Sequence, residues 1–179
     1  RSDRYILNDV TFSDINDEGD GGPDVVQVAR MFFDALRLDS DGEVLFAALA
    51  LEGIAATDDM DGTVVRLERV ILDGPNSVMT HDFGRAVAGE NDDDFEPDWN
   101  LYEFEGFAIE GLVGQGEEDG NPFEFSLAQF VVEQYSRAEL GRLAMPGFAF
   151  LGADEDGENG TVNTGEMWSP GSPRAALGA

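Results

Sequence analysis

The most constraining feature of the sequence is a long β-hairpin pattern over residues 100–135, which reads NLYEFEGFAIEGLVGQGEEDGNPFEFSLAQFVVEQY. Two apolar, aromatic-rich runs are joined by an acidic, glycine-rich segment, as expected for two antiparallel strands and their turn. Related patterns occupy residues 45–72 and 145–168. Aligning the three patterns places Gly53, Gly106 and Gly147 in one column. The sequence therefore predicts an antiparallel, β-rich fold.

Other stretches predict a further strand and three short helices. Tyr5–Phe12 predicts an outer strand, the second of a hairpin whose first strand lies upstream or is missing. A first helix is predicted from an Asp24 cap, because apolar residues then recur at helical spacing; they are Val25, Val28, Met31, Phe32 and Leu36. The other two helices are predicted over Ser77–Ala88 and over Ser136–Leu143, where Glu139 completes a capping box.

These elements together predict an α+β, β-rich domain. We expect a curved antiparallel sheet built from repeated long β-hairpins, with three short helices packed on one face. The single domain is expected over residues 1–168, in units of about 1–40, 41–90, 91–143 and 144–168. Residues 169–179 are expected to form a flexible tail or a linker to a missing part, and both ends suggest a piece of a longer precursor.

The charge of the chain limits its partners and its location. The formal net charge is −28, from 38 acidic and 10 basic residues, and every basic residue is an arginine. Such a surface stays soluble in salt, and it indicates a halophile or a marine bacterium and an extracytoplasmic place: periplasmic, cell-surface or secreted. No basic stripe is available to displace counterions, so nucleic-acid binding is not expected. No apolar run approaches the ~20 residues of a membrane span.

Three acidic turns share the D-x-D-G spacing that begins many calcium loops. Carboxylates on alternate residues can converge on one hard cation. The commoner interpretation is that Asp-Gly supplies the positive φ angles of hairpin turns. None of the turns continues as an EF-hand, so calcium stays open as a cofactor. The candidate ligands are Asp39, Asp41, Asp59, Asp61, Asp154 and Asp156.

Residues suited to catalysis are few. The chain has no cysteine and a single histidine, His81, which could act as a base beside Asp82. No GxSxG or SxxK motif is present. The glycines after residue 105 lack the lysine and helix start of a phosphate loop. We therefore expect no enzymatic activity.

An aromatic stripe recurs along the predicted hairpins and forms the candidate ligand or interface surface. One interpretation is core packing against helices. The other is an incompletely covered sheet face that binds a lipid-like ligand or another subunit. We expect a structural or assembly subunit that acts through this surface and its edge strands, with protein partners or self-association. The alternative is a module that carries an apolar ligand. The residues are Phe104, Phe107, Ile109, Phe123, Phe125, Phe130, Phe148 and Phe150.

Overall fold

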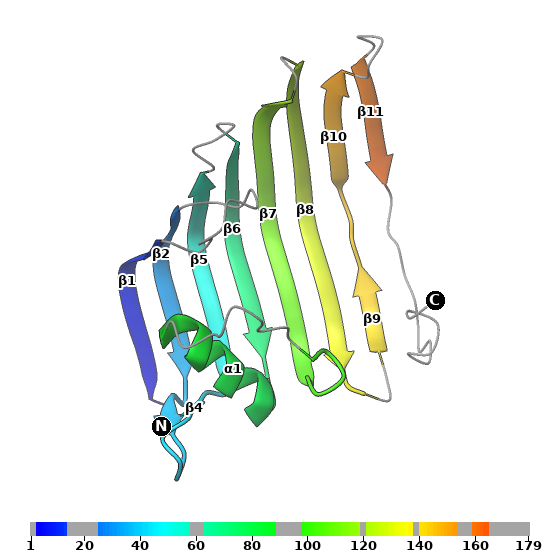
Figure 1. The fold of residues 1–179 in the computed structure, drawn as a ribbon. Helices are drawn as coiled ribbons and strands as arrows, with labels where there is room; N and C mark the ends of the chain where they lie inside the picture. Colours follow the sequence, from blue (N-terminus) through cyan, green and yellow to red (C-terminus); the bar gives the residue numbers. More distant parts are fainter. Residues whose placement is uncertain are drawn as a thin grey trace.

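A computed structural model describes residues 3–13, 25–57, 63–88, 98–118, 121–137, 140–153 and 159–164. One large antiparallel sheet dominates them, with the strand order β1-β2-β5-β6-β7-β8-β10-β11 and β9 paired with β8 (Figure 1). The strands are β1 Arg4–Ser13, β2 Val25–Asp34, β5 Ala48–Thr57, β6 Val64–Asp73, β7 Phe104–Glu118, β8 Asn121–Tyr135, β9 Leu140–Ala144, β10 Phe148–Ala153 and β11 Asn159–Thr164. A small separate sheet pairs β3 (Arg37–Leu38) with β4 (Val44–Leu45).

The prediction of a β-rich fold with a large antiparallel sheet is confirmed, but the helix content is not. The described residues contain one helix, α1, over Ser77–Ala88, at the predicted bounds. The predicted first helix is wrong, because residues 25–34 form β2. The predicted third helix is also wrong where the chain is described, because Leu140–Ala144 form β9. The predicted repeat of hairpin, short helix and acidic loop is therefore not confirmed.

A line of paired residues crosses the sheet from β1 to β10, and every second residue in it has a left-handed backbone. Its positive-φ members are Asp9 on β1, Gly53 on β5, Gly111 on β7 and Gly147 at the start of β10, with φ between 55° and 73°. The pairing register places Ala29, Glu68 and Ala128 between them on the intervening strands. We call this line the first crease. The four left-handed residues of this crease all lie on, or directly before, strands that run in the same direction, β1, β5, β7 and β10.

A second crease lies near the other end of the strands. Here the positive-φ residues are Ala35, Gly74 and Gln134, at the ends of β2, β6 and β8, which run in the opposite direction. Hydrogen bonds place Asp3 beside Ala35 and Ala47 beside Gly74 in the same line. We call the sheet between the creases the central panel; it comprises residues 4–8, 30–34, 48–52, 69–73, 106–110 and 129–133.

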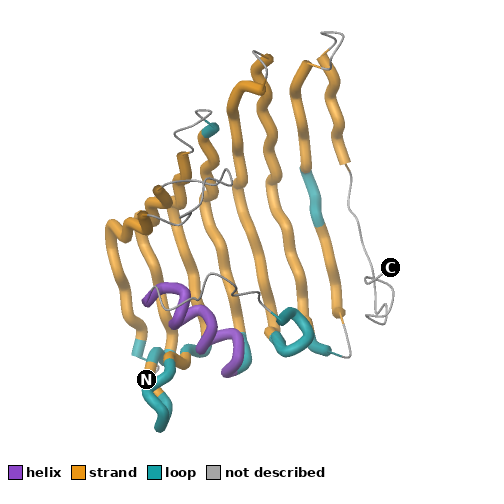
Figure 2. The backbone as a smooth tube through the Cα atoms, viewed as in Figure 1, coloured by secondary structure: helices purple, strands orange, loops and turns teal. Residues whose placement is uncertain are grey.

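The first crease explains why residues 25–36 resemble a helix in sequence. In a regular strand, side chains alternate between the faces. Val28 and Met31 are three positions apart, yet both are 2% exposed and belong to the same core cluster. The alternation therefore restarts at the crease, and a strand acquires the i, i+3 spacing of an amphipathic helix. The tube of Figure 2 shows β1 and β2 bending rather than running straight.

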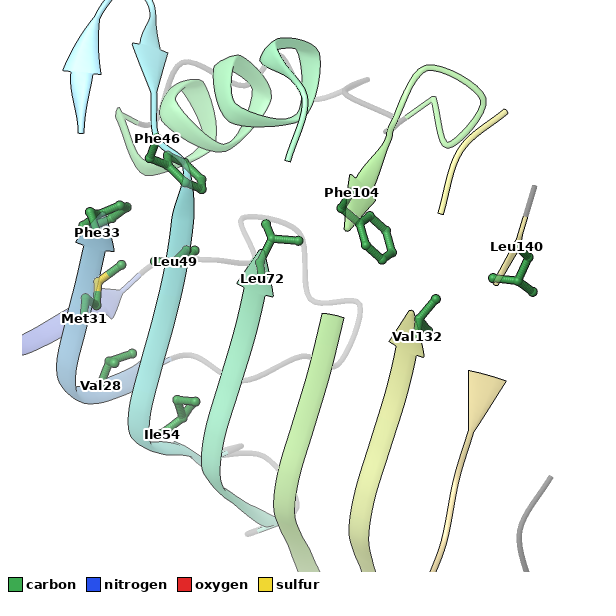
Figure 3. Close-up of a cluster of buried hydrophobic side chains, with 10 residues drawn as sticks. All are labelled: Val28, Met31, Phe33, Phe46, Leu49, Ile54, Leu72, Phe104, Val132 and Leu140. Atoms are coloured by element: carbon green, nitrogen blue, oxygen red, sulfur yellow. The ribbon is translucent and has the colours of Figure 1, made fainter. Parts of the chain in front are cut away.

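The core lies on the face of the sheet that carries α1, which we call the front face (Figure 3). Opposed residues of antiparallel strands share a face, so the register defines rows of side chains. One front row joins Phe33, Leu49, Leu72, Phe107 and Val132. A neighbouring front row joins Leu7, Met31, Leu51, Val70, Ile109 and Phe130. Apolar side chains thus run across the whole front face.

Helix α1 is held over one corner of this face. Its N-cap is Asn76, whose Oδ1 accepts a hydrogen bond from the N–H of Met79 at 3.1 Å. Phe83 on the helix packs edge-on against Phe33 and Phe46, with ring centroids 6.0 and 5.5 Å away. The Tyr102 hydroxyl donates to Asp82 Oδ2 at 2.9 Å, and burial raises the pKa of this tyrosine to about 12, helped by that bond. The helix therefore closes the core only at this corner.

Candidate functional site

The predicted aromatic surface maps largely onto the front face of β7, β8 and β10. Phe107 lies opposite Val132, Ile109 opposite Phe130, and Leu127 opposite Phe148. These predicted residues are half-buried. Phe104 differs, because it is 9% exposed and stacks on Tyr135 with the ring centroids 5.1 Å apart. Phe104 is thus part of the core, whereas the half-buried Phe107, Ile109, Phe130 and Phe148 contribute to a broad apolar surface.

Two of the predicted phenylalanines cover glycines on the neighbouring strand. Phe125 lies opposite Gly114 and Phe123 opposite Gly116. A Cβ atom at Gly116 would lie 2.6 Å from the Phe123 ring, and one at Gly114 would meet the Phe125 ring. The two rings stack with their centroids 6.4 Å apart and their planes 12° apart. The backbone of Phe150 on β10 pairs with that of Phe125 in the register.

The front face of β7, β8 and β10 carries no second layer in the described part of the chain. Figure 1 shows α1 over the strands at the N-terminal side of the sheet, whereas the upper parts of β7, β8 and β10 have no helix or strand before them. This arrangement explains why Phe123, Phe125 and Phe130 are only half-buried. Whether this surface binds a ligand or another chain stays a prediction.

The back face of the central panel carries a ladder of alternating charge that sequence analysis missed. The register aligns Asn8, Arg30, Glu52, Arg69, Glu110 and Gln129 in one row. Glu52 lies 2.7 Å from Arg30 and 3.7 Å from Arg69. Its position in the middle of the row gives each guanidinium an acidic neighbour. The signal in the sequence is the polar residue directly before each crease glycine, as in Glu52-Gly53 and Glu110-Gly111.

A hollow of about 140 Å³ opens on the back face beside this ladder. Its lining includes two alanines with small side chains: Ala50 lies between Phe32 and Ile71 in the register, and Ala48 lies between Asp34 and Asp73. Its other lining residues include the charged side chains Arg4, Asp34, Glu52, Arg69 and Asp73. Arg4 already forms two hydrogen bonds with Asp34, at 2.7 and 2.8 Å, and this bonding lowers the pKa of the Asp34 carboxyl. The hollow is thus polar at its rim and suits no large apolar ligand.

The edge strand β1 is the most exposed apolar element of the described sheet. Tyr5, Ile6 and Leu7 are 49%, 51% and 49% exposed. Because these residues are consecutive, they expose apolar surface on both faces of the strand. Long apolar edges are sites where another polypeptide can add a strand. The sequence prediction of an outer strand over Tyr5–Phe12 is confirmed here.

The acidic turns are described only in part. Asp39 Oδ1 accepts hydrogen bonds from the backbone N–H groups of Asp41 and Glu43 at 2.8 and 3.0 Å. These hydrogen bonds lower the pKa of the Asp39 carboxyl and stabilise the turn between β3 and β4. Among the described residues no group of three metal-ligating side chains is present. The candidate ligands Asp59, Asp61, Asp154 and Asp156 lie outside the described residues.

The only histidine contacts the first of these turns rather than its sequence neighbour. His81 Nε2 lies 3.2 Å from Asp39 Oδ2, at an angle that makes no hydrogen bond. Asp82, predicted as a partner of His81, instead accepts the hydroxyl of Tyr102. His81 therefore contributes to the attachment of α1 to the β3–β4 turn.

Comparisons with known proteins give no further assignment. A scan against protein-family models finds no match, and searches of curated proteins and of solved structures find none either. Within the described residues, the single helix is too short and too polar to traverse a bilayer.

Proposed function

We propose that the chain is a non-enzymatic structural or assembly subunit that acts through the aromatic front face and the edge strands of its sheet. The observation that carries the proposal is the continuity of the front rows. They run from Phe130 on β8 to Leu7 on β1, where they end at an exposed edge. Apolar rows that end at a free strand gain burial when another polypeptide continues the sheet.

The charge of the chain makes such a role dependent on salt. A net charge of −28 makes separate copies repel one another in solution. In 0.1 M salt this repulsion is largely screened beyond ~10 Å. The central panel departs from this acidity, since its back face places Arg4, Arg30 and Arg69 beside carboxylates. With three arginines against five carboxylates, the panel is far less acidic than the chain as a whole, which favours contact with another protein surface. Composition also supports an extracytoplasmic location.

A carrier of a lipid-like ligand is the second candidate. It is favoured by the half-buried front face of β7, β8 and β10, over which the described residues place no second layer. Calcium bound at the acidic turns would stiffen the hairpins of such a carrier. We rank this function second because the hollow described above lies on the back face and has a charged rim.

Mass measurement of the protein isolated from its own source, without detergent, tests both functions. A subunit is expected to sediment at multiples of 19.4 kDa or with stoichiometric companion chains. Solvent extraction of the same sample that releases an apolar molecule on the order of a few hundred daltons per chain would favour the carrier instead. A bare monomer at every protein and salt concentration would contradict both.

A further inference from the structure

The backbone of β1 presents its free hydrogen-bonding groups in a defined alternation. The carbonyl of Asp3 accepts a hydrogen bond from the N–H of Ala35 at 3.0 Å, so residue 3 bonds to β2. In an antiparallel pair, alternate residues bond to the neighbouring strand and the others point away. The N–H and C=O groups of Arg4, Ile6 and Asn8 therefore point to the free edge. No described strand lies beyond that edge.

The side chains of the same segment are arranged symmetrically about Ile6. If two identical strands pair antiparallel with Ile6 at the centre, Ile6 faces Ile6 and Tyr5 faces Leu7. Arg4 then faces Asn8, which offers an amide oxygen to the guanidinium. Apolar and aromatic–aliphatic cross-strand pairs stabilise a sheet, and no like charges oppose each other between residues 4 and 8. The segment is thus complementary to itself.

The creases of the two copies also align in this register. Asp9 in the first crease and Asp3 in the line of the second crease lie equally far from Ile6 along β1. Pairing centred on Ile6 therefore brings the first crease of one copy into line with the second crease of the other. The two central panels then continue as one surface, and Arg4, Ile6 and Asn8 form the hydrogen-bonded pairs. The pairing is isologous, as a two-fold dimer requires.

We propose that two copies of this chain form a two-fold dimer by antiparallel pairing of β1 with β1, with Ile6 opposite Ile6 of the second copy. This inference rests on the proposed assembly function and specifies its partner and its register. The pairing buries the exposed residues Tyr5, Ile6 and Leu7 together. The pairing of Asp9 with Asp3 and the net charge of −28 oppose dimerisation at low salt. The dimer is therefore tighter at high salt.

Single-cysteine variants test the register directly, because the chain contains no cysteine. Ile6→Cys places two thiols opposite each other at the two-fold axis. Thr11→Cys is the matched control, because Thr11 is exposed on the same strand. It lies on the same face as Ile6 because the alternation of side chains restarts at the first crease between them. Its two copies would be offset by about 34 Å along the strands. With a short bis-maleimide in high salt, Ile6→Cys is expected to give a covalent dimer and Thr11→Cys a monomer.

A charge substitution provides a second measurement that does not depend on cross-linking. Ile6→Lys opposes two like charges at the axis, so the dimer Kd from sedimentation equilibrium is expected to rise at least about tenfold. Leu151→Lys is the control, because Leu151 is 50% exposed on β10 and takes no part in the pairing. Its Kd should stay within about twofold of the parent.

The outcomes separate this inference from the function on which it rests. A chain that self-associates while Ile6→Cys and Thr11→Cys cross-link equally, or while Ile6→Lys leaves the Kd unchanged, overturns the β1 pairing and leaves the assembly function standing. If the chain binds only companion proteins and not itself, the β1 pairing is likewise overturned and the assembly function is retained. A monomer without companions in high salt overturns both.

Discussion

The two faces of the central panel are built from the same strands but are stabilised by different forces. On β2, Met31 faces the front and is 2% exposed, whereas its neighbour Phe32 faces the back and is only half-buried. The front face gains free energy mainly from apolar burial, which salt and pH change little. The back face adds ion pairs at half-exposed positions, which salt screens and acid removes. The comparison predicts that substitutions on the two faces differ in size and in their response to solution conditions.

The largest effect is expected from truncation on the front face. Met31→Ala leaves a cavity in the core, so the free energy of unfolding should fall by about 2–4 kcal/mol. Phe32→Ala on the back face should cost less, about 1 kcal/mol, because its side chain is already partly in water. Urea unfolding followed by circular dichroism measures both. Equal losses would show that something covers the back face as fully as the front.

The crease that separates the sheet into panels is expected to be the next most sensitive feature. Gly53→Ala adds a Cβ atom 2.9 Å from that of Ala29, at a residue with a φ of 64°, and should cost about 1–3 kcal/mol. Gly42→Ala is the control, since its φ is 88° but no atom lies within 4 Å of the added Cβ. In the same unfolding assay, Gly42→Ala should lower the free energy of unfolding by less than Gly53→Ala does. A neutral Gly53→Ala would contradict the crease geometry.

Charge removal on the back face is expected to have a smaller, salt-dependent effect. Glu52→Gln deprives Arg30 and Arg69 of their shared carboxylate and should cost roughly 0.5–1 kcal/mol at low salt, because the pairs are partly exposed. Glu133→Gln is the control, as its pair with Arg142 is about half exposed on both sides. The Glu52→Gln loss should shrink in 1 M salt, whereas that of Met31→Ala should not. A salt-independent Glu52→Gln loss would mean that the ladder is more deeply buried than the structure shows.

The smallest effect is expected from the Arg4–Asp34 pair and depends on pH. Hydrogen bonding from Arg4 lowers the pKa of Asp34 in the folded protein below the ordinary value of an aspartate. The unfolded chain therefore binds a proton at higher pH than the folded one. The contribution of the pair is complete above about pH 5 and is lost as the pH falls through the folded pKa. The stability difference between the parent and Asp34→Asn should shrink accordingly in acid-series melts, and a constant difference would exclude this linkage.

Part of the candidate site could be predicted from local patterns. The stretch from Phe123 to Leu127 alternates strongly, so its strand and its aromatic face were evident. The helix at Ser77–Ala88 was predicted at its observed bounds, and Asn76, directly before it, forms the N-cap. The back-face ladder was missed because its charges come from four strands. Only the register brings Arg30, Glu52 and Arg69 together.

The crease also shows why glycine alignment within hairpins can mislead. The sequence analysis aligned Gly106 with Gly53 and Gly147 because the segments around them are similar. In the structure, Gly53 and Gly147 belong to the first crease, but Gly111 takes the place expected for Gly106. The matching sequence is Ile109-Glu-Gly-Leu, which resembles Leu51-Glu-Gly-Ile equally well. Gly106 and Gly111 have equally similar local sequences, and strand pairing places Gly111 in the first crease.

The sequence by itself determined the antiparallel β-rich character, the helix α1 and the acidity of this protein, because alternation, capping and composition are local properties. The tertiary structure decided that residues 25–34 form a strand and that the front rows align from β1 to β8. A strand that crosses a crease and a turn of helix give the same i, i+3 spacing of apolar side chains, as at Val28 and Met31 on β2. Only pairing with strands distant in sequence distinguishes the two, since it satisfies the backbone groups of β2 on both sides.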